Sequence, residues 1–224
     1  MAIPGIQLTI LIGESEPRPI PRELVEAFQS LEVTHNDQGR SGFQLVFRDG
    51  RRDRRDLYDY RWIANPLFNV FNRVILVITI GSTAQVLMDG VITHLQLSPS
   101  TDIGQSTTTL TGEDLSVLMD LNERSDHHIG QDEATIAQVI LSRYRKYGVM
   151  PDVKVPDYRD RPTKNQRIPT QQGTDLNYLR LIAGRFSYVF YLTPGPQVGL
   201  SQAYWGPPLK STNPQKALTV NMGS

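Results

Sequence analysis

The sequence has no cysteine, no net charge and no long apolar run. Its 224 residues include no Cys, which excludes disulfide bonds, thiolate catalysis and cysteine-ligated zinc. Lys plus Arg equals Asp plus Glu at 23 each, so no global field draws the chain to nucleic acid or acidic lipid. The apolar run at residues 74–80 is far too short to cross a bilayer. We therefore expect no nucleic-acid partner and no direct membrane insertion.

The start of the chain also lacks the basic segment and small-residue cleavage site of a secretory signal. We therefore expect the protein to be made in the cytoplasm. An apolar fraction of 39% with 21% charged residues is ordinary for a globular protein that can bury a core. The 15 prolines favour strands and shaped loops over a helical bundle.

Sequence motifs of common enzymes and metal sites are missing as well. There is no Gly-x-Ser-x-Gly elbow and no phosphate-binding glycine loop. His127 and His128 are adjacent, so their side chains diverge in any regular structure, and a polar loop is the favoured interpretation. Asp120 and Glu123 lie one helical turn apart, which favours a solvated helix face over an acid–base pair. We predict no catalytic residue, no cofactor and no metal.

Residues 1–112 are dominated by strand patterns. Residues 31–34 and 43–47 are β-rich runs joined by turn formers, which predicts a hairpin. Residues 74–80 form a continuous β-branched run, typical of a strand with both faces covered. Further strands are expected at residues 7–12, 85–88, 91–97 and 107–110. The pattern predicts a tube-like antiparallel β-barrel with one short helix.

A highly charged loop follows the hairpin. Residues 48–56 contain five arginines and three aspartates, a composition that no core could hold. Arg51, Arg52, Arg54 and Arg55 could bind phosphate, but the interleaved aspartates disfavour DNA. Two interpretations stay open: a loop that makes charge-paired contacts with a neighbouring subunit, or a loop that is merely solvated.

Helical periodicity begins near Thr111, a candidate cap that precedes acidic residues. Asp132 is predicted to cap a second helix that ends at Gly148, and Thr174 is predicted to cap a third. Four prolines between residues 150 and 169 indicate a linker. An aromatic strand at 188–191 and a returning strand at 198–203 complete the pattern.

The predicted class is therefore α+β, in three parts. Residues 1–112 form the tube-like barrel, residues 113–165 form a helical insertion with a Pro-rich linker, and residues 166–224 begin a second barrel-like domain with a helix and an aromatic hairpin. The last part lacks enough strands for a closed sheet, so we expect it to be incomplete and the natural product to continue beyond residue 224.

The order of these motifs resembles the baseplate hub family of contractile phage tails and injection systems, also called the late control gene D family. The resemblance spans nearly the whole chain. It depends on five short motifs, at residues 89–92 (DGVI), 111–115 (TGEDL), 174–179 (TDLNYL), 204–208 (YWGPP) and 218–223 (LTVNMG).

The resemblance implies a structural role without enzymatic activity. In that family, three subunits with two barrels each form a ring that adapts the hexameric inner tube to the trimeric spike. It implies a homotrimer in an assembled tail or injection particle, with the spike, inner-tube rings and other baseplate proteins as partners. Strands 43–47 and 74–80 would form the ring wall, and Phe43, Phe47 and Trp205 are interface candidates beside the arginine loop.

Two alternatives are also considered. An inner-tube or tube-initiator subunit would share the barrel and form hexamers, although the helical section disfavours it. A carbohydrate-binding tail accessory would use Tyr204 and Trp205 as an exposed platform, but such aromatics are more often buried in a core or an interface.

Overall fold

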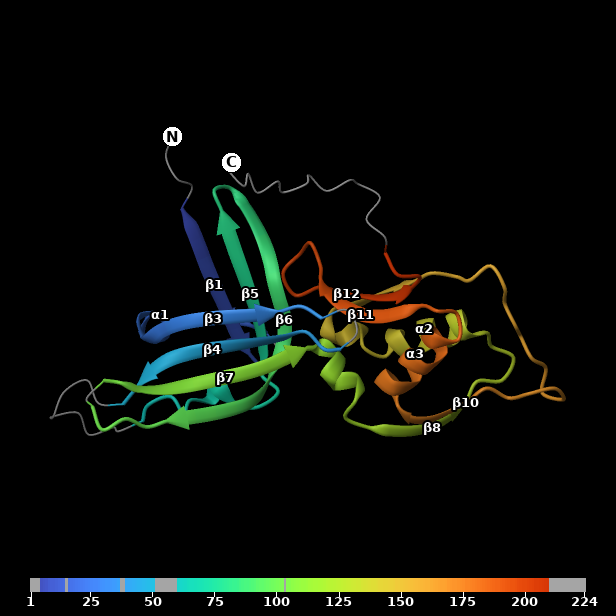
Figure 1. Ribbon diagram of the computed structural model, residues 1–224, viewed down its shortest axis with the longest axis horizontal. Coiled ribbons are helices and arrows are strands. Elements are labelled where there is room, and N and C mark those ends of the chain that lie inside the picture. Colours follow the sequence, from blue (N-terminus) through green and yellow to red (C-terminus); the bar gives the residue numbers. More distant parts are fainter. Residues whose placement is uncertain (1–4, 15, 37–38, 51–59, 103, 210–224) are drawn as a thin grey trace, which may run out of the picture.

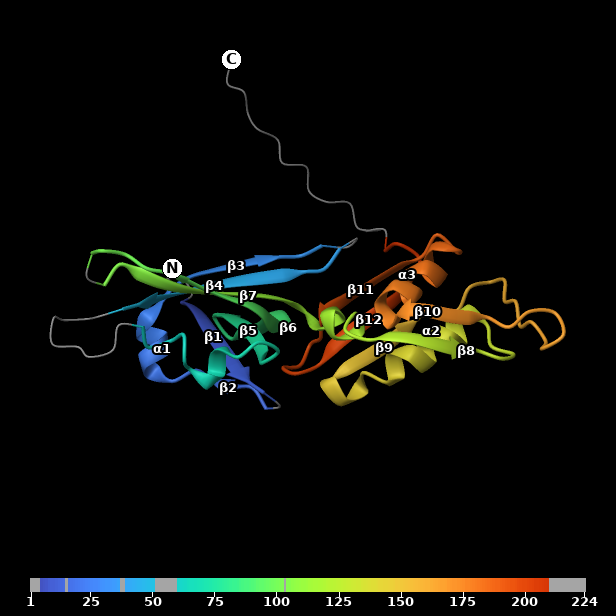
Figure 2. The same cartoon turned by 90° about the horizontal axis from the view of Figure 1, so that it is seen from below.

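The computed structural model describes residues 5–14, 16–36, 39–50, 60–102 and 104–209. The molecule is elongated, with strands gathered at one end and the two longer helices at the other (Figures 1 and 2). We call residues 6–114 the sheet lobe and residues 115–206 the helical lobe. The predicted α+β class is confirmed.

The sheet lobe is a single antiparallel sheet of seven strands in the order β2-β1-β5-β6-β7-β4-β3. Its helical elements are α1 (Arg22–Ala27) and the 3-10 turn η1 (Pro66–Phe68). The strands are β1 (Ile6–Gly13), β2 (Arg18–Pro19), β3 (Phe28–Thr34), β4 (Gly42–Asp49), β5 (Arg73–Ile80), β6 (Thr83–Ser98) and β7 (Ser106–Asp114).

This sheet folds over itself, so that β1 and β5 cross beneath β3, β4 and β7 (Figures 1 and 2). The 16-residue strand β6 belongs to both layers and has a register shift between Ile92 and His94, which allows it to bend. Between the layers lies an apolar core that includes the fully buried Leu45, Phe47 and Phe68. No hydrogen-bonded pair of described strands closes the sheet into a barrel.

The helical lobe surrounds two helices with short strands. Helices α2 and α3 lie between a three-stranded sheet, ordered β11-β12-β9, and a two-stranded ribbon of β8 and β10 (Figure 1). Its elements are η2 (Leu115–Met119), β8 (Glu123–His127), α2 (Glu133–Ser142), η3 (Arg145–Tyr147), β9 (Val149–Val153), β10 (Thr170–Thr174), α3 (Asp175–Gly184), β11 (Val189–Pro194) and β12 (Ser201–Gly206).

Strand β6 of the sheet lobe contributes side chains to the cores of both lobes. Neighbouring side chains of a strand point to opposite faces, so Ile92 enters the core of the sheet lobe while Val91 enters the core of the helical lobe. Leu115, which directly follows β7, also belongs to the second core. The sheet lobe therefore supplies part of the apolar surface on which the helical lobe packs.

Several sequence-based predictions are confirmed. The predicted hairpin is β3 and β4, paired from Thr34 with Gly42. Asp132 caps α2 by accepting a hydrogen bond from the Thr135 N–H, and Thr174 caps α3 by accepting one from the Asn177 N–H. The end of the second helix was predicted wrongly, because α2 ends at Ser142 and Gly148, with a positive φ of 79°, ends only the separate short turn η3.

Other predictions were wrong. Thr111 was expected to start a helix, but Thr111 and Glu113 lie in strand β7, which pairs with β4 and β6. Asp114 caps only the short turn η2. The expected insertion contains strands β8 and β9 as well as a helix, because a short polar strand carries little hydrophobic periodicity. No helix within the described ranges is long and apolar enough to span a membrane.

Candidate functional site: polar joints and open sheet edges

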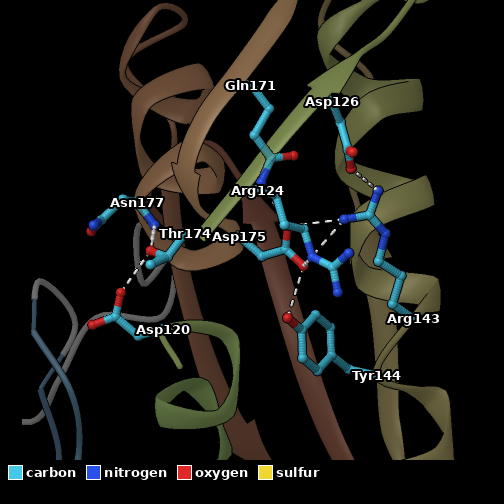
Figure 3. Close-up of polar contacts among 9 residues, drawn as sticks. All are labelled: Asp120, Arg124, Asp126, Arg143, Tyr144, Gln171, Thr174, Asp175 and Asn177. Carbon is cyan, nitrogen blue, oxygen red and sulfur yellow. Dashed lines mark hydrogen bonds and ion pairs between the residues drawn. The ribbon is translucent and has the colours of Figure 1, made fainter. Parts of the chain in front are cut away.

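The most densely connected polar group in the helical lobe is the carboxylate of Asp175, at the start of α3 (Figure 3). It accepts hydrogen bonds from Gln171 Nε2 at 2.7 Å, Tyr144 Oη at 2.8 Å and Arg143 Nη1 at 3.0 Å. Arg124 Nε lies 3.4 Å away. Burial and these contacts with Asp175 raise the pKa of the Tyr144 hydroxyl above its usual value.

This cluster connects four elements. Arg143 at the end of α2 also reaches Asp126 on β8 at 2.7 Å, while Gln171 belongs to β10. The Asp175 side chain is 1% exposed and its oxygens are occupied by protein donors. Because a general base must reach a substrate proton, this geometry suits a structural joint better than acid–base chemistry.

A second joint lies between the lobes. Arg73 on β5 holds Asp89 on β6 through two hydrogen bonds of 2.7 and 2.6 Å. The same guanidinium donates to the Gly199 carbonyl at 2.9 Å, and the Ser201 hydroxyl donates to Asp89 at 3.0 Å. A fixed bidentate fork of this kind specifies both distance and angle. It therefore sets how the start of β12 sits on the sheet lobe.

The backbones also approach closely at this second joint. A Cβ atom added at Gly148 would come within 2.1 Å of the Gly199 carbonyl oxygen. Gly148 also has a positive φ, so both its conformation and its surroundings require glycine.

A third joint connects the β3–β4 hairpin to α3. Arg40 donates to Glu113 at 2.7 Å and pairs with Asp120, whose other oxygen accepts from the Thr174 hydroxyl at 2.6 Å (Figure 3). Arg180 on α3 donates to the Gly39 carbonyl at 2.8 Å. Asp120, a carboxylate considered for acid–base work, is thus held between the lobes.

Of the predicted interface residues, Phe43, Phe47 and Trp205 lie in the part of the chain that the structure describes. Arg51, Arg52, Arg54 and Arg55 lie outside the described residues. Phe43 and Phe47 are 3% and 0% exposed in the core of the sheet lobe, because their strand alternation points them between the layers. The side chains of Phe43 and Phe47 therefore offer a partner almost no surface.

Trp205 was also expected to contact a partner, and here too the expectation is corrected. Its indole is 0% exposed, packs edge-on against Tyr188 with centroids 5.1 Å apart, and donates from Nε1 to the Leu179 carbonyl at 3.2 Å. Tyr204 is 4% exposed. These aromatics are core residues, and they do not form the exposed platform that a carbohydrate-binding module needs.

The strands expected to form a ring wall also have no open edge. Both edges of β4 are occupied, by β3 and β7, and both edges of β5 are occupied, by β1 and β6. The outer strands of the sheet are instead β3 at one end and β2 with β1 at the other. Sequence patterns alone do not give strand order, which is why the edges were misplaced.

The two histidines were expected in a polar loop, but they lie at the end of a strand and directly after it. His127 lies in β8 beside Thr170, whereas His128 is 5% exposed and stacks on the Tyr178 ring with centroids 5.8 Å apart. Within the described ranges, no group of three or more His, Cys, Asp or Glu side chains could hold a metal ion.

No protein-family model matches the sequence, and no curated protein matches it. Solved structures do share the fold. A tail protein from Neisseria meningitidis MC58 superposes with a TM-score of 0.55 and 14% identity, over 89% of this chain and 50% of that one. The 43 kDa tail protein of prophage MuSo2 from Shewanella oneidensis gives 0.55 and 14%, over 89% and 53%.

A third similar structure is an E. coli component of the type VI secretion system, described as structurally similar to the bacteriophage T4 tail proteins gp27 and gp5. It superposes with a TM-score of 0.53 and 12% identity, over 90% of this chain and 46% of that one. The chain thus spans about half the length of these structures. At such identities the likeness establishes a common fold.

Proposed function

We propose that this chain is a structural subunit of a contractile phage tail or a related injection particle, and that it forms the central hub between the inner tube and the spike. The observation that carries the proposal is the fold. Nearly nine-tenths of the chain superposes on tail proteins and on a secretion-system component. Proteins with no enzymatic role do their work through shape, and the joints described above fix the shape of this one.

In the proposed role three copies surround the particle axis, with the inner-tube ring on one face and the trimeric spike on the other. A hub of this kind transmits force between neighbours, so its lobes must keep a constant angle. The joint of Arg73 with Asp89 and the joint of Arg40 with Asp120 supply that rigidity. The outer surface of the helical lobe then faces the other baseplate proteins.

The proposal is tested by measuring the molar mass of the protein in solution. The protein is purified, and its molar mass is measured by light scattering, first alone and then with the spike protein of the same particle. We expect a trimer that co-elutes with the spike. A chain that stays monomeric in both samples would contradict the hub, and a hexamer that ignores the spike would identify a subunit of the inner tube instead.

A further inference from the structure

Within the part of the chain that the structure describes, strand β1 has an open edge along most of its length. It pairs with β5 from Ile6 to Gly13, but on its other side β2 covers only Leu11 and Ile12. The Ile20 N–H donates to the Ile10 carbonyl at 3.0 Å, so the backbone polar groups of Ile10 point to that outer side. Backbone direction alternates along a strand, so Leu8 and Ile6 present their N–H and C=O groups to the same open side.

The apolar face of this strand is also incompletely covered. Ile12 and Ile10 are buried, and Leu8 is half-buried. Ile6 is 70% exposed, and its cross-strand partner Ile80 is 48% exposed. A groove of about 280 Å³ runs beside the open edge, lined mainly by β1, Ile20, Val25 and Phe28. An open edge beside an apolar groove has the two features of a strand-addition site.

The opposite end of the same sheet carries a matching edge. Among the described strands, β3 pairs with β4 alone and has no partner on its other side. Its alternate residues Leu31 and Val33 pack partly against the core of the sheet lobe, while Ser30 and Glu32 are exposed on the other face. Uncovered edges of this length invite aggregation unless another chain covers them.

The polarity of the two edges is complementary. Every neighbouring pair in the sheet is antiparallel, so β1 and β3, the first and last of six consecutive strands, run in opposite senses along it. When a second copy is added head to tail, its β3 therefore meets β1 as one more antiparallel pair. Because β1 and β3 cross steeply (Figure 1), successive copies are rotated relative to one another, which favours a closed ring over a flat ribbon.

We infer that the occupant of the β1 edge is strand β3 of a second copy of this chain. This inference rests on the proposed function, since it specifies how hub subunits join. Antiparallel pairing that places Leu31 opposite Leu8 also places Val33 opposite Ile6. The half-covered apolar side chains of both edges then cover one another, and the polar pair of Ser30 with Thr9 stays on the outer face.

The absence of cysteine makes the chain a clean background for disulfide trapping. The backbone of Thr9 points to β5, so Thr9 and Ser30 of the second copy form a non-hydrogen-bonded pair, the closer kind, within the Cα range that a disulfide spans. Under mild oxidation, the double variant Thr9→Cys/Ser30→Cys should give covalent dimers and trimers on non-reducing gels. Each single variant, and the control Thr193→Cys/Ser30→Cys with an exposed β11 position, should not produce trimers.

A second variant tests the same edge without oxidation. Ile6→Lys adds a charge to an exposed side chain, so the fold should survive, while self-association should weaken at least about tenfold. Leu181→Lys is the matched control, because Leu181 is 58% exposed on α3, away from both edges, and should leave self-association unchanged.

The outcomes separate this inference from the proposed function. A disulfide formed within one chain would show that β3 closes the sheet in cis, and would overturn the inference. Intact trimers without cross-links would also overturn it, while leaving the hub in place. A chain that is monomeric under all conditions would count against both.

Discussion

The two lobes bury acidic side chains in different ways. Away from the joint between the lobes, the buried acids of the sheet lobe, Asp49 and Asp114, accept hydrogen bonds mainly from backbone N–H groups and a hydroxyl, such as the Ser41 N–H at 2.7 Å and Thr108 Oγ1 at 2.6 Å. Asp89, which is paired with Arg73, is the exception and lies where the two lobes meet. In the helical lobe, the buried acids Asp132, Glu133 and Asp175 are instead paired with arginines. These acids hold loops in one lobe and join separate helices and strands in the other.

The difference follows from what each lobe has to connect. A sheet provides its own backbone ladder, so a buried aspartate away from the joint with the helical lobe needs only to fix a turn. The helical lobe joins a ribbon, two helices and a small sheet, and long arginine side chains can span these gaps. Buried ion pairs are costly to break, so we expect the helical lobe to be more sensitive to acid and to loss of one charged partner.

Each lobe also contains one of the two tryptophans, Trp62 in the sheet lobe and Trp205 in the helical lobe. Fluorescence of variants that retain one tryptophan therefore reports each lobe separately. The shared strand β6 and the joints predict that both signals change at the same urea concentration.

The largest expected effect comes from Trp205→Ala. Loss of a fully buried indole should lower the free energy of unfolding by about 4 kcal/mol. Urea unfolding, followed by the remaining Trp62, should shift to a lower midpoint because the lobes are coupled. An unchanged Trp62 transition would show that the lobes unfold independently. Phe71→Ala, at a side chain that is 47% exposed, is the control and should change little.

Next comes Asp89→Asn, at the joint between the lobes. It leaves the partly buried Arg73 without its charged partner, and should cost about 3 kcal/mol. The two tryptophan signals should then separate along the urea axis. The double variant Arg73→Met/Asp89→Leu, which removes both charges, should cost less than the single one; a larger loss would contradict the pairing argument.

Acid should act on the helical lobe through Asp132. Burial alone would raise the pKa of this carboxyl, but hydrogen bonds from Arg161 and Thr135 and the charge of Arg159 outweigh it and lower the pKa to about 2. The folded-state pKa lies below the unfolded value, so this stability is present above pH 4 and is lost as the pH falls towards 2.

The measurement is the unfolding free energy of the wild type and of Asp132→Asn between pH 5 and pH 2. The advantage of the wild type should shrink by about 2 kcal/mol over this range. A constant difference would show that the ion pairs with Arg159 and Arg161 do not carry the stability.

The smallest effect is expected for Arg40→Gln at the third joint. The Arg40 side chain is 28% exposed, so loss of its pairs with Glu113 and Asp120 should cost about 1 kcal/mol, and less in high salt. Arg22→Gln is the matched control, because the Arg22 side chain is 92% exposed beside Glu26 and should contribute nothing measurable. If Arg40→Gln and Arg22→Gln changed the free energy of unfolding in urea equally, the pairs of Arg40 would not stabilise the joint.

The sequence allowed local elements to be predicted and left their assembly open. The turn formers between β3 and β4 and the caps Asp132 and Thr174 are short-range signals, and each is confirmed. Strand β8 carries polar side chains at almost every position, so its pairing with β10 depends on tertiary context and was missed.

The candidate site was harder to predict than the fold. The alternation of Phe43 and Phe47 indicates one buried face but cannot tell a core from an interface. The joint between Arg73 and Asp89 links side chains 16 residues apart to Ser201, a relation with no local signature. The open edges of β1 and β3 follow only from strand order, which emerges once the whole sheet is known.

The proposed arrangement is three copies of this chain around a common axis between tube and spike. It is tested most directly by a reconstruction of native particles in which the protein carries a compact label. We expect three labels around the axis at the junction of the tube and the spike. Labels at the periphery of the particle, or six labels repeated along the tube, would contradict it.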